Sequence, residues 1–248
     1  MTTQDLEGRV ALVTGGGSGL GRSISLELAG RGAHVLVADI DADGAARTVE
    51  AVGAIGAAGG AEAVPLDVTD SAAVDEVVAR AAAEHGARFD LLVNNAGTDR
   101  GADLTDVEDD QWHGVFAVNV HGPMYLGRAF VRHLRAAGAS TGDIVCVVSI
   151  SALTVGAGAG AYNASKAAMH KLAEVMQTES RERGWPARVS IIDPAAMATP
   201  MMDQWGLPPE RMMDPAIVAG LVATAVTLPP EVVLQNVVVT LRNEYYPR

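Results

Sequence analysis

The sequence has little of several residue types, and each scarcity excludes something. A single cysteine, Cys146, makes an intrachain disulfide impossible and argues against a cysteine-based metal site, so no metal is expected. Aromatic residues make up 4% of the 248 residues against 49% hydrophobic residues, so aliphatic side chains must fill the core. Only two of the 18 basic residues are lysines, Lys166 and Lys171. Either a coding bias left them there, or one performs a task that arginine cannot.

Runs of positive charge and long apolar runs are also missing. The sequence has 18 basic and 30 acidic residues, which gives a formal net charge of -12. Because it has no cluster of basic residues that could follow a phosphate backbone, nucleic acid is not an expected partner. The longest stretch without Asp, Glu, Lys or Arg, Ile144–Ser165, contains glycines and hydroxyl residues, which indicates a strand and a loop rather than a membrane span. The first ten residues lack a signal-peptide pattern. These features predict a cytoplasmic protein without a membrane association.

Apolar segments of strand length alternate with amphipathic segments along the whole chain. The alternation predicts an α/β fold: a single doubly wound Rossmann-type domain over residues 1–248, with a parallel sheet of about seven strands and helices on both faces. The expected strands are Val10–Thr14, His34–Ala38, Glu62–Leu66, Leu91–Asn94, Ile144–Val148, Arg188–Ile192 and Val237–Leu241. The expected helices begin near Leu20, Asp43, Ser71, Asp109, Tyr162 and Pro215.

Local signals refine this outline at three places. Asp70 or Ser71 is expected to cap the third helix, and Thr105 with Glu108 fits a capping box for the fourth. The stretch Gly53–Gly60 indicates a frayed helix end and a turn.

A glycine-rich loop follows the first expected strand directly. Because the loop, Gly15 to Gly21, leads into the first helix, its backbone N–H groups and the positive helix end are suited to a pyrophosphate. Asp39 ends the second strand, where a carboxylate accepts hydrogen bonds from both ribose hydroxyls of NAD and repels the 2′-phosphate of NADP. Neither Ile40 nor Ser18 supplies a cation for that phosphate. NAD is therefore the predicted cofactor and NADP the less favoured one; the alternative role for Asp39 is to cap the next helix.

A second group of residues has the chemistry of proton transfer. Tyr162 and Lys166 are four positions apart in a helical segment and so share one face. A phenol with a pKa of about 10 is a poor base at neutral pH, and a neighbouring ammonium stabilises the phenolate, so Tyr162 is a candidate general acid or base. Ser149 lies at the end of the fifth strand, where such a sheet opens its ligand crevice, and its hydroxyl can donate to a carbonyl oxygen. Ser151 is a less well spaced rival.

With these motifs the sequence resembles the short-chain dehydrogenase/reductase family over essentially the whole chain. Thr14–Gly21 matches the TGxxxGxG loop and Tyr162–Lys166 the YxxxK motif, with Asn94–Gly97 matching NNAG between them. Asp67 and Val68 match the adenine-binding pair, and Pro194–Thr199 the PGxxxT segment. The resemblance implies a catalytic set of Asn119, Ser149, Tyr162 and Lys166. It implies cofactor contacts from Gly15, Gly17, Ser18, Gly19, Leu20, Gly21, Asp39, Ile40, Asp67, Val68, Asn95, Ala96, Gly97, Tyr162, Lys166, Pro194, Met197 and Thr199.

The resemblance also implies the role of each catalytic residue. Tyr162 donates or removes the alcohol proton, Lys166 lowers the pKa of Tyr162 and binds the nicotinamide ribose, and Ser149 orients the substrate oxygen. Asn119 holds, through its backbone, a water that relays protons from Lys166. Asn95 and Asn119 have an alternative interpretation as satisfied polar groups of a turn and a helix.

The chain departs from the family pattern in two places. Ala195 replaces the glycine after Pro194, which puts the contacts of Met197 and Thr199 in doubt. The C-terminal segment Leu228–Arg248 lacks the glycine-rich ending common in tetrameric members. A homodimer or homotetramer is still expected from the family. The alanine-rich helix faces near residues 117–137 and 161–173 suit either subunit packing or packing on the chain's own sheet.

The substrate is expected to meet the loops that follow the strands, Thr98–Thr105, Ile150–Ala161 and Ala196–Asp214. Residues 196–214, the predicted lid, carry Met197, Met201, Met202, Trp205, Leu207, Met212 and Met213, which suit an adaptable apolar surface or simply pack the loop down. The predicted function is an oxidoreductase that moves a hydride between NAD(H) and a secondary alcohol or ketone that has an apolar part and is larger than a few carbons. The alternatives are an NADPH-dependent ketone or 3-oxoacyl-thioester reductase and, with less support, a non-catalytic dinucleotide-binding or scaffold protein.

Overall fold

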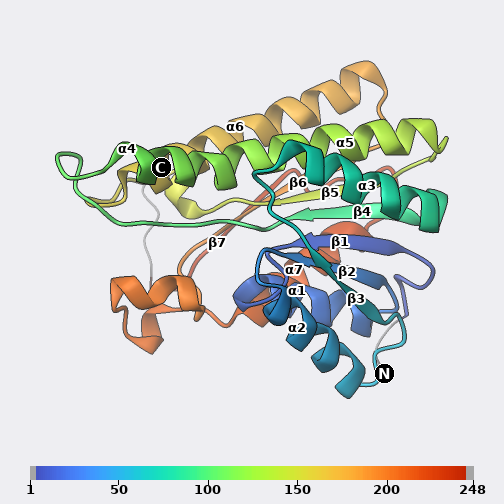
Figure 1. Cartoon of the computed structure of the whole chain (residues 1–248), viewed down its shortest axis with the longest axis horizontal. Coiled ribbons are helices and arrows are strands. Elements are labelled where there is room, and N and C mark those ends of the chain that lie inside the picture. Colours follow the sequence, from blue (N-terminus) through green and yellow to red (C-terminus); the bar gives the residue numbers. More distant parts are fainter. Residues whose placement is uncertain (1–3, 244–248) are drawn as a thin grey trace.

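Seven parallel strands form one sheet in the computed structural model, which describes residues 4–243 (Figure 1). The strand order is β3-β2-β1-β4-β5-β6-β7, so the order reverses between β1 and β4 and opens a crevice at the carboxyl ends of these strands. The strands are β1 (Val10–Thr14), β2 (His34–Asp39), β3 (Ala61–Pro65), β4 (Phe89–Asn94), β5 (Asp143–Val147), β6 (Arg188–Pro194) and β7 (Asn236–Val239). The predicted doubly wound α/β fold is confirmed.

Helices cover both faces of the sheet, and each face has its own apolar core. Figure 1 shows α1, α2 and α7 on one face and α3, α4, α5 and α6 on the other, and the two clusters of buried side chains divide in the same way. The helices are α1 (Gly19–Gly30), α2 (Ala42–Ala54), α3 (Ser71–His85), α4 (Asp109–Phe116), α5 (Gly122–Ala136), α6 (Gly160–Arg183) and α7 (Pro215–Thr227). The cores are aliphatic, as the scarcity of aromatic residues predicts. Within residues 4–243, no helix is long and apolar enough to cross a membrane.

The observed strands differ from the expected ones mainly at their ends. β1 has the predicted bounds, but β4 begins at Phe89 rather than Leu91. Asp90 interrupts the apolar pattern there, yet Arg9 neutralises its carboxylate with contacts of 2.9 and 3.0 Å, so a charged residue fits inside the strand. β6 continues to Pro194, which pairs with Val239 of β7.

Of the two predicted helix caps, one is confirmed and the other is wrong. Asp70 caps α3, since its Oδ1 accepts from the backbone N–H groups of Ala72 and Ala73 at 2.9 and 3.1 Å. The capping box of Thr105 and Glu108 is not formed, because Glu108 is itself the N-cap residue and makes no side-chain capping bond. The expected turn after α2 is confirmed, since the helix ends at Ala54.

A π-helical segment also interrupts what the sequence suggests is one helix. Ala117–His121 lies between α4 and α5 and contains Asn119. Such wider turns are frequent at functional sites.

Candidate active site

A cavity of about 920 Å³ lies at the carboxyl ends of the strands, within the size range of ligand pockets. It brings together nearly all the residues that the sequence assigns to cofactor and catalysis. Those that line it are Gly15, Ser18, Gly19, Leu20, Gly21, Asp39, Ile40, Asp67, Val68, Asn95, Ala96, Gly97, Ser149, Tyr162, Lys166, Pro194, Met197 and Thr199. Two predicted residues, Gly17 and Asn119, lie behind the lining rather than in it.

The glycine-rich loop between β1 and α1 packs too tightly for side chains at its centre. A Cβ on Gly21 would lie 2.0 Å from the carbonyl oxygen of Gly15, and Gly15 itself has a φ of +63°. The turn therefore keeps its backbone bare at the N-terminal end of α1, facing the cavity. This is the backbone arrangement that a dinucleotide pyrophosphate requires, so these residues fit such a cofactor.

Asp39 holds this loop from the end of β2. Its Oδ2 accepts from the backbone N–H of Gly17 at 2.8 Å and its Oδ1 from the N–H of Asp41 at 2.9 Å. The N-cap residue of α2 is Asp41, so Asp39 does not take the capping role that the sequence left open. Its carboxylate is fixed at the cavity wall beside Ile40.

The NNAG segment ties the cofactor loop to the proton-transfer residues. Asn95 donates from Nδ2 to the carbonyl oxygen of Thr14 at 2.8 Å, and its backbone N–H donates to Oγ1 of Thr14 at 3.1 Å. A Cβ on Gly97 would lie 3.4 Å from both Nζ of Lys166 and Oδ1 of Asn119. The segment after β4 therefore passes directly beside the lysine and Asn119.

Asn119 is fully buried beneath the cavity, and its side chain is satisfied there. Its Oδ1 accepts from the Thr98 N–H at 2.8 Å, while its Nδ2 donates to the Thr98 carbonyl and to Oγ of Ser165, both at 2.9 Å. The side chain thus fastens the π-helical segment to the loop after β4. A role for its backbone in a proton relay stays a prediction.

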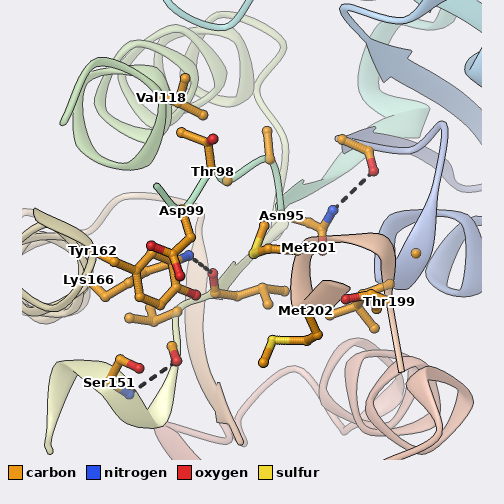
Figure 2. A pocket seen from close by; sticks show the side chains of 18 of the residues that line it. Asn95, Thr98, Asp99, Val118, Ser151, Tyr162, Lys166, Thr199, Met201 and Met202 are labelled. Carbon is orange, nitrogen blue, oxygen red and sulfur yellow. Dashed lines mark hydrogen bonds between the residues drawn. The ribbon is translucent and has the colours of Figure 1, made fainter. Parts of the chain in front are cut away.

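Tyr162 and Lys166 lie one turn apart on α6 and face the cavity with Ser149 (Figure 2). The Nζ of Lys166 is 5.6 Å from the centre of the Tyr162 ring and donates to the carbonyl oxygen of Val147 at 3.3 Å. Ser149 makes a side-chain hydrogen bond to Tyr162, and its Oγ also accepts from the N–H of Ser151 at 3.1 Å. This arrangement favours Ser149 over Ser151 as the partner of Tyr162.

Burial dominates the titration of this pair. It raises the pKa of Tyr162 to about 12, although the Ser149 hydrogen bond acts in the opposite direction. Burial also lowers the pKa of Lys166 to about 8, against the charge of Asp193, which raises it. The lowering of the Tyr162 pKa expected from Lys166 is not found: burial and the charge of Asp99 raise this pKa, and Ser149 lowers it.

Two residues behind the catalytic group escaped the sequence reasoning. Asp193, at the end of β6, is completely buried, and its Oδ1 lies 3.3 Å from Nδ1 of His170 and 3.4 Å from the N–H of Ser149. His170 follows Lys166 by one turn on α6. Burial raises the pKa of Asp193, and His170 lowers it. The available signal was a single acidic residue inside the apolar segment that precedes Pro194.

The predicted lid divides between the cavity and the core. Met197, Met201, Met202, Trp205 and Leu207 line the cavity, whereas Met213 is buried in the core next to α7. Thr199 lies against the cofactor loop, since a Cβ on Gly19 would come within 3.2 Å of its side chain.

The substitution of glycine by Ala195 is accommodated locally. Ala195 is buried, and its N–H donates to the Val239 carbonyl at 2.9 Å. The segment that follows still brings Met197 and Thr199 to the cavity wall. The unusual chain end, residues 244–248, lies outside the described residues.

Comparisons with known proteins agree with this geometry. The family model described as short chain dehydrogenase matches residues 9–209. The chain is 40% identical over 198 residues to 1-deoxy-11-beta-hydroxypentalenate dehydrogenase of Streptomyces avermitilis, covering 79% of this chain and 71% of that protein. This chain belongs to the short-chain dehydrogenase/reductase family.

Further similarities lie in the same family. Galactitol 2-dehydrogenase (L-tagatose-forming) of Cereibacter sphaeroides is 38% identical over 198 residues, covering 79% of this chain and 74% of that protein. The crystal structure of a short-chain type dehydrogenase/reductase from Mycobacterium marinum superposes with a TM-score of 0.86 at 25% identity, covering 96% of each chain. As a short-chain dehydrogenase/reductase, the protein is an NAD(P)-dependent oxidoreductase that acts on the CH–OH groups of small molecules.

Proposed function

We propose that this short-chain dehydrogenase interconverts a secondary alcohol and its ketone with NAD(H) in preference to NADP(H). The observation that carries the cofactor choice is Asp39, whose carboxylate is fixed at the cavity wall by two backbone N–H groups. A carboxylate held there accepts hydrogen bonds from ribose hydroxyls and repels a 2′-phosphate. Two basic residues line the cavity: Arg100 lies in the loop after β4, and Lys166 lies on α6. Neither belongs to the segment after β2, where Asp39 lies.

The proton chemistry is assigned to Tyr162. The dinucleotide, when bound, supplies or accepts the hydride. Tyr162 gives its phenolic proton to the carbonyl oxygen in reduction and takes the alcohol proton in oxidation, and the Ser149 hydroxyl, which lines the same cavity, donates to the reacting oxygen and orients it. The Lys166 ammonium, 5.6 Å from the ring centre, offsets the negative charge left on the phenolate. A non-catalytic role would need none of these three groups.

The cofactor preference is tested by titrating the protein with NAD and NADP in a calorimeter. NAD should bind at least about 10-fold more tightly, because the 2′-phosphate would lie against the Asp39 carboxylate. The Asp39→Asn variant keeps an oxygen for the Gly17 N–H but removes the charge, so the preference should shrink while the fold is kept. Equal or tighter binding of NADP by the natural protein would contradict the proposed preference.

The reaction itself is tested with a panel of secondary alcohols, following the absorbance of the reduced nicotinamide with each dinucleotide in parallel. Formation of reduced cofactor with at least one alcohol supports the proposal. Tight dinucleotide binding without turnover of any alcohol or ketone would instead favour the scaffold alternative. A homodimer or homotetramer stays a prediction from the family.

A further inference from the structure

The loop after β4 is joined to the lid at Asp99 and Gly101. The indole Nε1 of Trp205 donates to Oδ2 of Asp99 at 2.9 Å, and Nε2 of Gln204 donates to the Asp99 carbonyl at 3.2 Å. The N–H of Gly101 donates to Oε1 of Gln204 at 3.4 Å, and a Cβ on Gly101 would lie 3.1 Å from the Trp205 ring. These contacts fix both the backbone and one carboxylate oxygen of Asp99 at the cavity.

The other carboxylate oxygen of Asp99 has no such partner. Oδ1 is buried, and no group among the described residues donates a hydrogen bond to it. The Lys166 ammonium, whose charge favours the ionised form of Asp99, directs its Nζ to the Val147 carbonyl. Burying a carboxylate oxygen without a hydrogen-bond donor costs more free energy than burying a neutral acceptor in the same way. We therefore expect a bound ligand to supply the missing donor.

Asp99 faces the same space as the proton-transfer residues. Figure 2 shows Asp99, Tyr162 and Lys166 directed into one cavity, and the charge of Asp99 acts on both of the other groups. Met201 and Met202 from the lid add apolar side chains to this wall, which also contains the neutral polar residues Thr98 and Ser151. A substrate that reacts at Tyr162 therefore has the Asp99 carboxylate available as a negatively charged acceptor in the same cavity.

We propose that Asp99 binds a second hydrogen-bond donor of the substrate, a hydroxyl or an ammonium group close to the alcohol carbon that reacts. This inference rests on the proposed function and narrows its substrate class to diols, polyols and amino alcohols. An anionic group at that position is disfavoured, because it would lie against the half-buried Asp99 carboxylate.

The same contact aids the proton transfer. The negative charge of Asp99 adds to the rise in the pKa of Tyr162. A donor on the substrate disperses that charge when it bonds to Oδ1, which favours the phenolate only while a correct substrate is present. Asp99 is thus a specificity-determining residue that also links substrate recognition to the readiness of the base.

The test compares Asp99→Asn with the natural protein on four matched probes with saturating NAD. The probes are vicinal cyclohexanediol, vicinal aminocyclohexanol, cyclohexanol, and cyclohexanol carrying a neighbouring carboxylate. The natural protein should turn over the diol, the amino alcohol or both with a kcat/KM about 10- to 100-fold above that of cyclohexanol, the range expected for a hydrogen bond to a charged group. A preference for both probes identifies any donor as sufficient, and a preference for the amino alcohol alone identifies a cation.

Asp99→Asn keeps an acceptor for Trp205, so it should fold like the natural protein but lose this preference, with the ratio of kcat/KM between the favoured probe and cyclohexanol falling to about 1. Asp103→Asn, an exposed carboxylate on the same loop, is the matched control and should keep the preference. An unchanged ratio in Asp99→Asn, or a natural preference for the anionic probe, overturns the proposal.

Calorimetric titration of the same probes into the protein with bound NAD gives a second readout that does not need turnover. If none of the probes is oxidised yet the diol or amino alcohol binds more tightly to the natural protein than to Asp99→Asn, the recognition role stands and the proposed reaction fails. If all probes react but bind equally well to both proteins, the recognition role fails and the proposed reaction stands.

Discussion

Both ends of the sheet carry buried charged groups, but the hydrogen bonds of these groups are complete at one end and incomplete at the other. At the amino ends of the strands, Asp143 accepts from Arg188 at 2.8 Å through one oxygen and from Arg9 at 2.7 Å through the other. Asp90 receives both of its contacts from Arg9, and Arg188 also donates to three backbone carbonyls after α7. Every carboxylate oxygen in this network has a donor.

At the carboxyl ends the charged groups are left incomplete. Oδ1 of Asp99 and Oδ2 of Asp193 are buried and accept no hydrogen bond from the described residues. Lys166 is 3% exposed and, within residues 4–243, makes a single hydrogen bond of 3.3 Å, to Val147. Asp99 and Lys166 line the cavity that contains Tyr162, and Asp193 lies behind its wall, next to Ser149.

This difference indicates that the charged groups at the amino ends stabilise the fold, whereas those at the carboxyl ends serve the reaction. A buried ionic group that is fully hydrogen-bonded anchors the elements it joins, whereas an incomplete one lowers stability and is retained where a ligand completes it. Breaking a pair at the amino ends should therefore cost stability, and removing a charge at the carboxyl ends should cost activity.

The largest expected effect is at the carboxyl ends, in Tyr162→Phe. Removing the phenolic hydroxyl leaves no group that can give or take the alcohol proton, so kcat should fall by roughly 10²- to 10⁴-fold. The ring is kept, so the melting temperature should stay close to that of the natural protein. Steady-state kinetics and thermal unfolding of the same preparation measure both, and turnover like that of the natural protein would show that another residue transfers the proton.

The sequence predicts those features of the fold and the site that depend on a local sequence pattern. The glycine loop, the strand β1 and the Tyr162–Lys166 spacing follow from backbone geometry and short-range periodicity, and the structure places them as expected. The wider turn around Asn119 carries no comparable signal, because π-helical and α-helical segments have the same apolar spacing over so few residues.

What the sequence could not predict is which distant side chains meet. Asp99 and Trp205 are separated by 106 positions, and Arg9 and Asp143 by 134, so no periodicity relates them. Both pairs depend on strand order and on the course of the lid, which become known only with the fold. Asp193 and His170 escaped for the same reason, since they meet across a helix and a strand.

The second expected effect is on stability at the amino ends, in Asp143→Ala. Its side chain is 5% exposed and pairs with two arginines, so its removal leaves both guanidinium groups short of a partner and should lower the free energy of unfolding by about 3 kcal/mol. Asp5→Ala, which removes an exposed partner of Arg31, is the control and should cost less than about 1 kcal/mol. Urea unfolding measures both, and a neutral Asp143→Ala would refute the structural role of the network.

The smallest expected change in stability is a gain, and it is expected for Lys166→Met. The groups that face Lys166 are Asp193 from β6, Cys146 from β5, Asp99 from the loop after β4 and Tyr162 from α6 itself. Despite them, burial lowers the pKa of Lys166 from 10.5 in the unfolded chain to about 8. The unfolded chain therefore binds more protons between these two values, so the unfavourable contribution of the ammonium is complete below pH 8 and fades as the pH rises to 10.5.

Lys166→Met should consequently lose activity and gain about 1–3 kcal/mol of stability at pH 7, with a smaller gain at pH 10. Urea unfolding of both proteins at the two pH values measures this difference. Lys171→Met is the matched control, because that lysine is exposed and pairs only with Glu174, so both stability and turnover should hardly change. A loss of stability in Lys166→Met at pH 7 would mean that the ammonium anchors the fold, and it would remove the distinction between the two ends of the sheet.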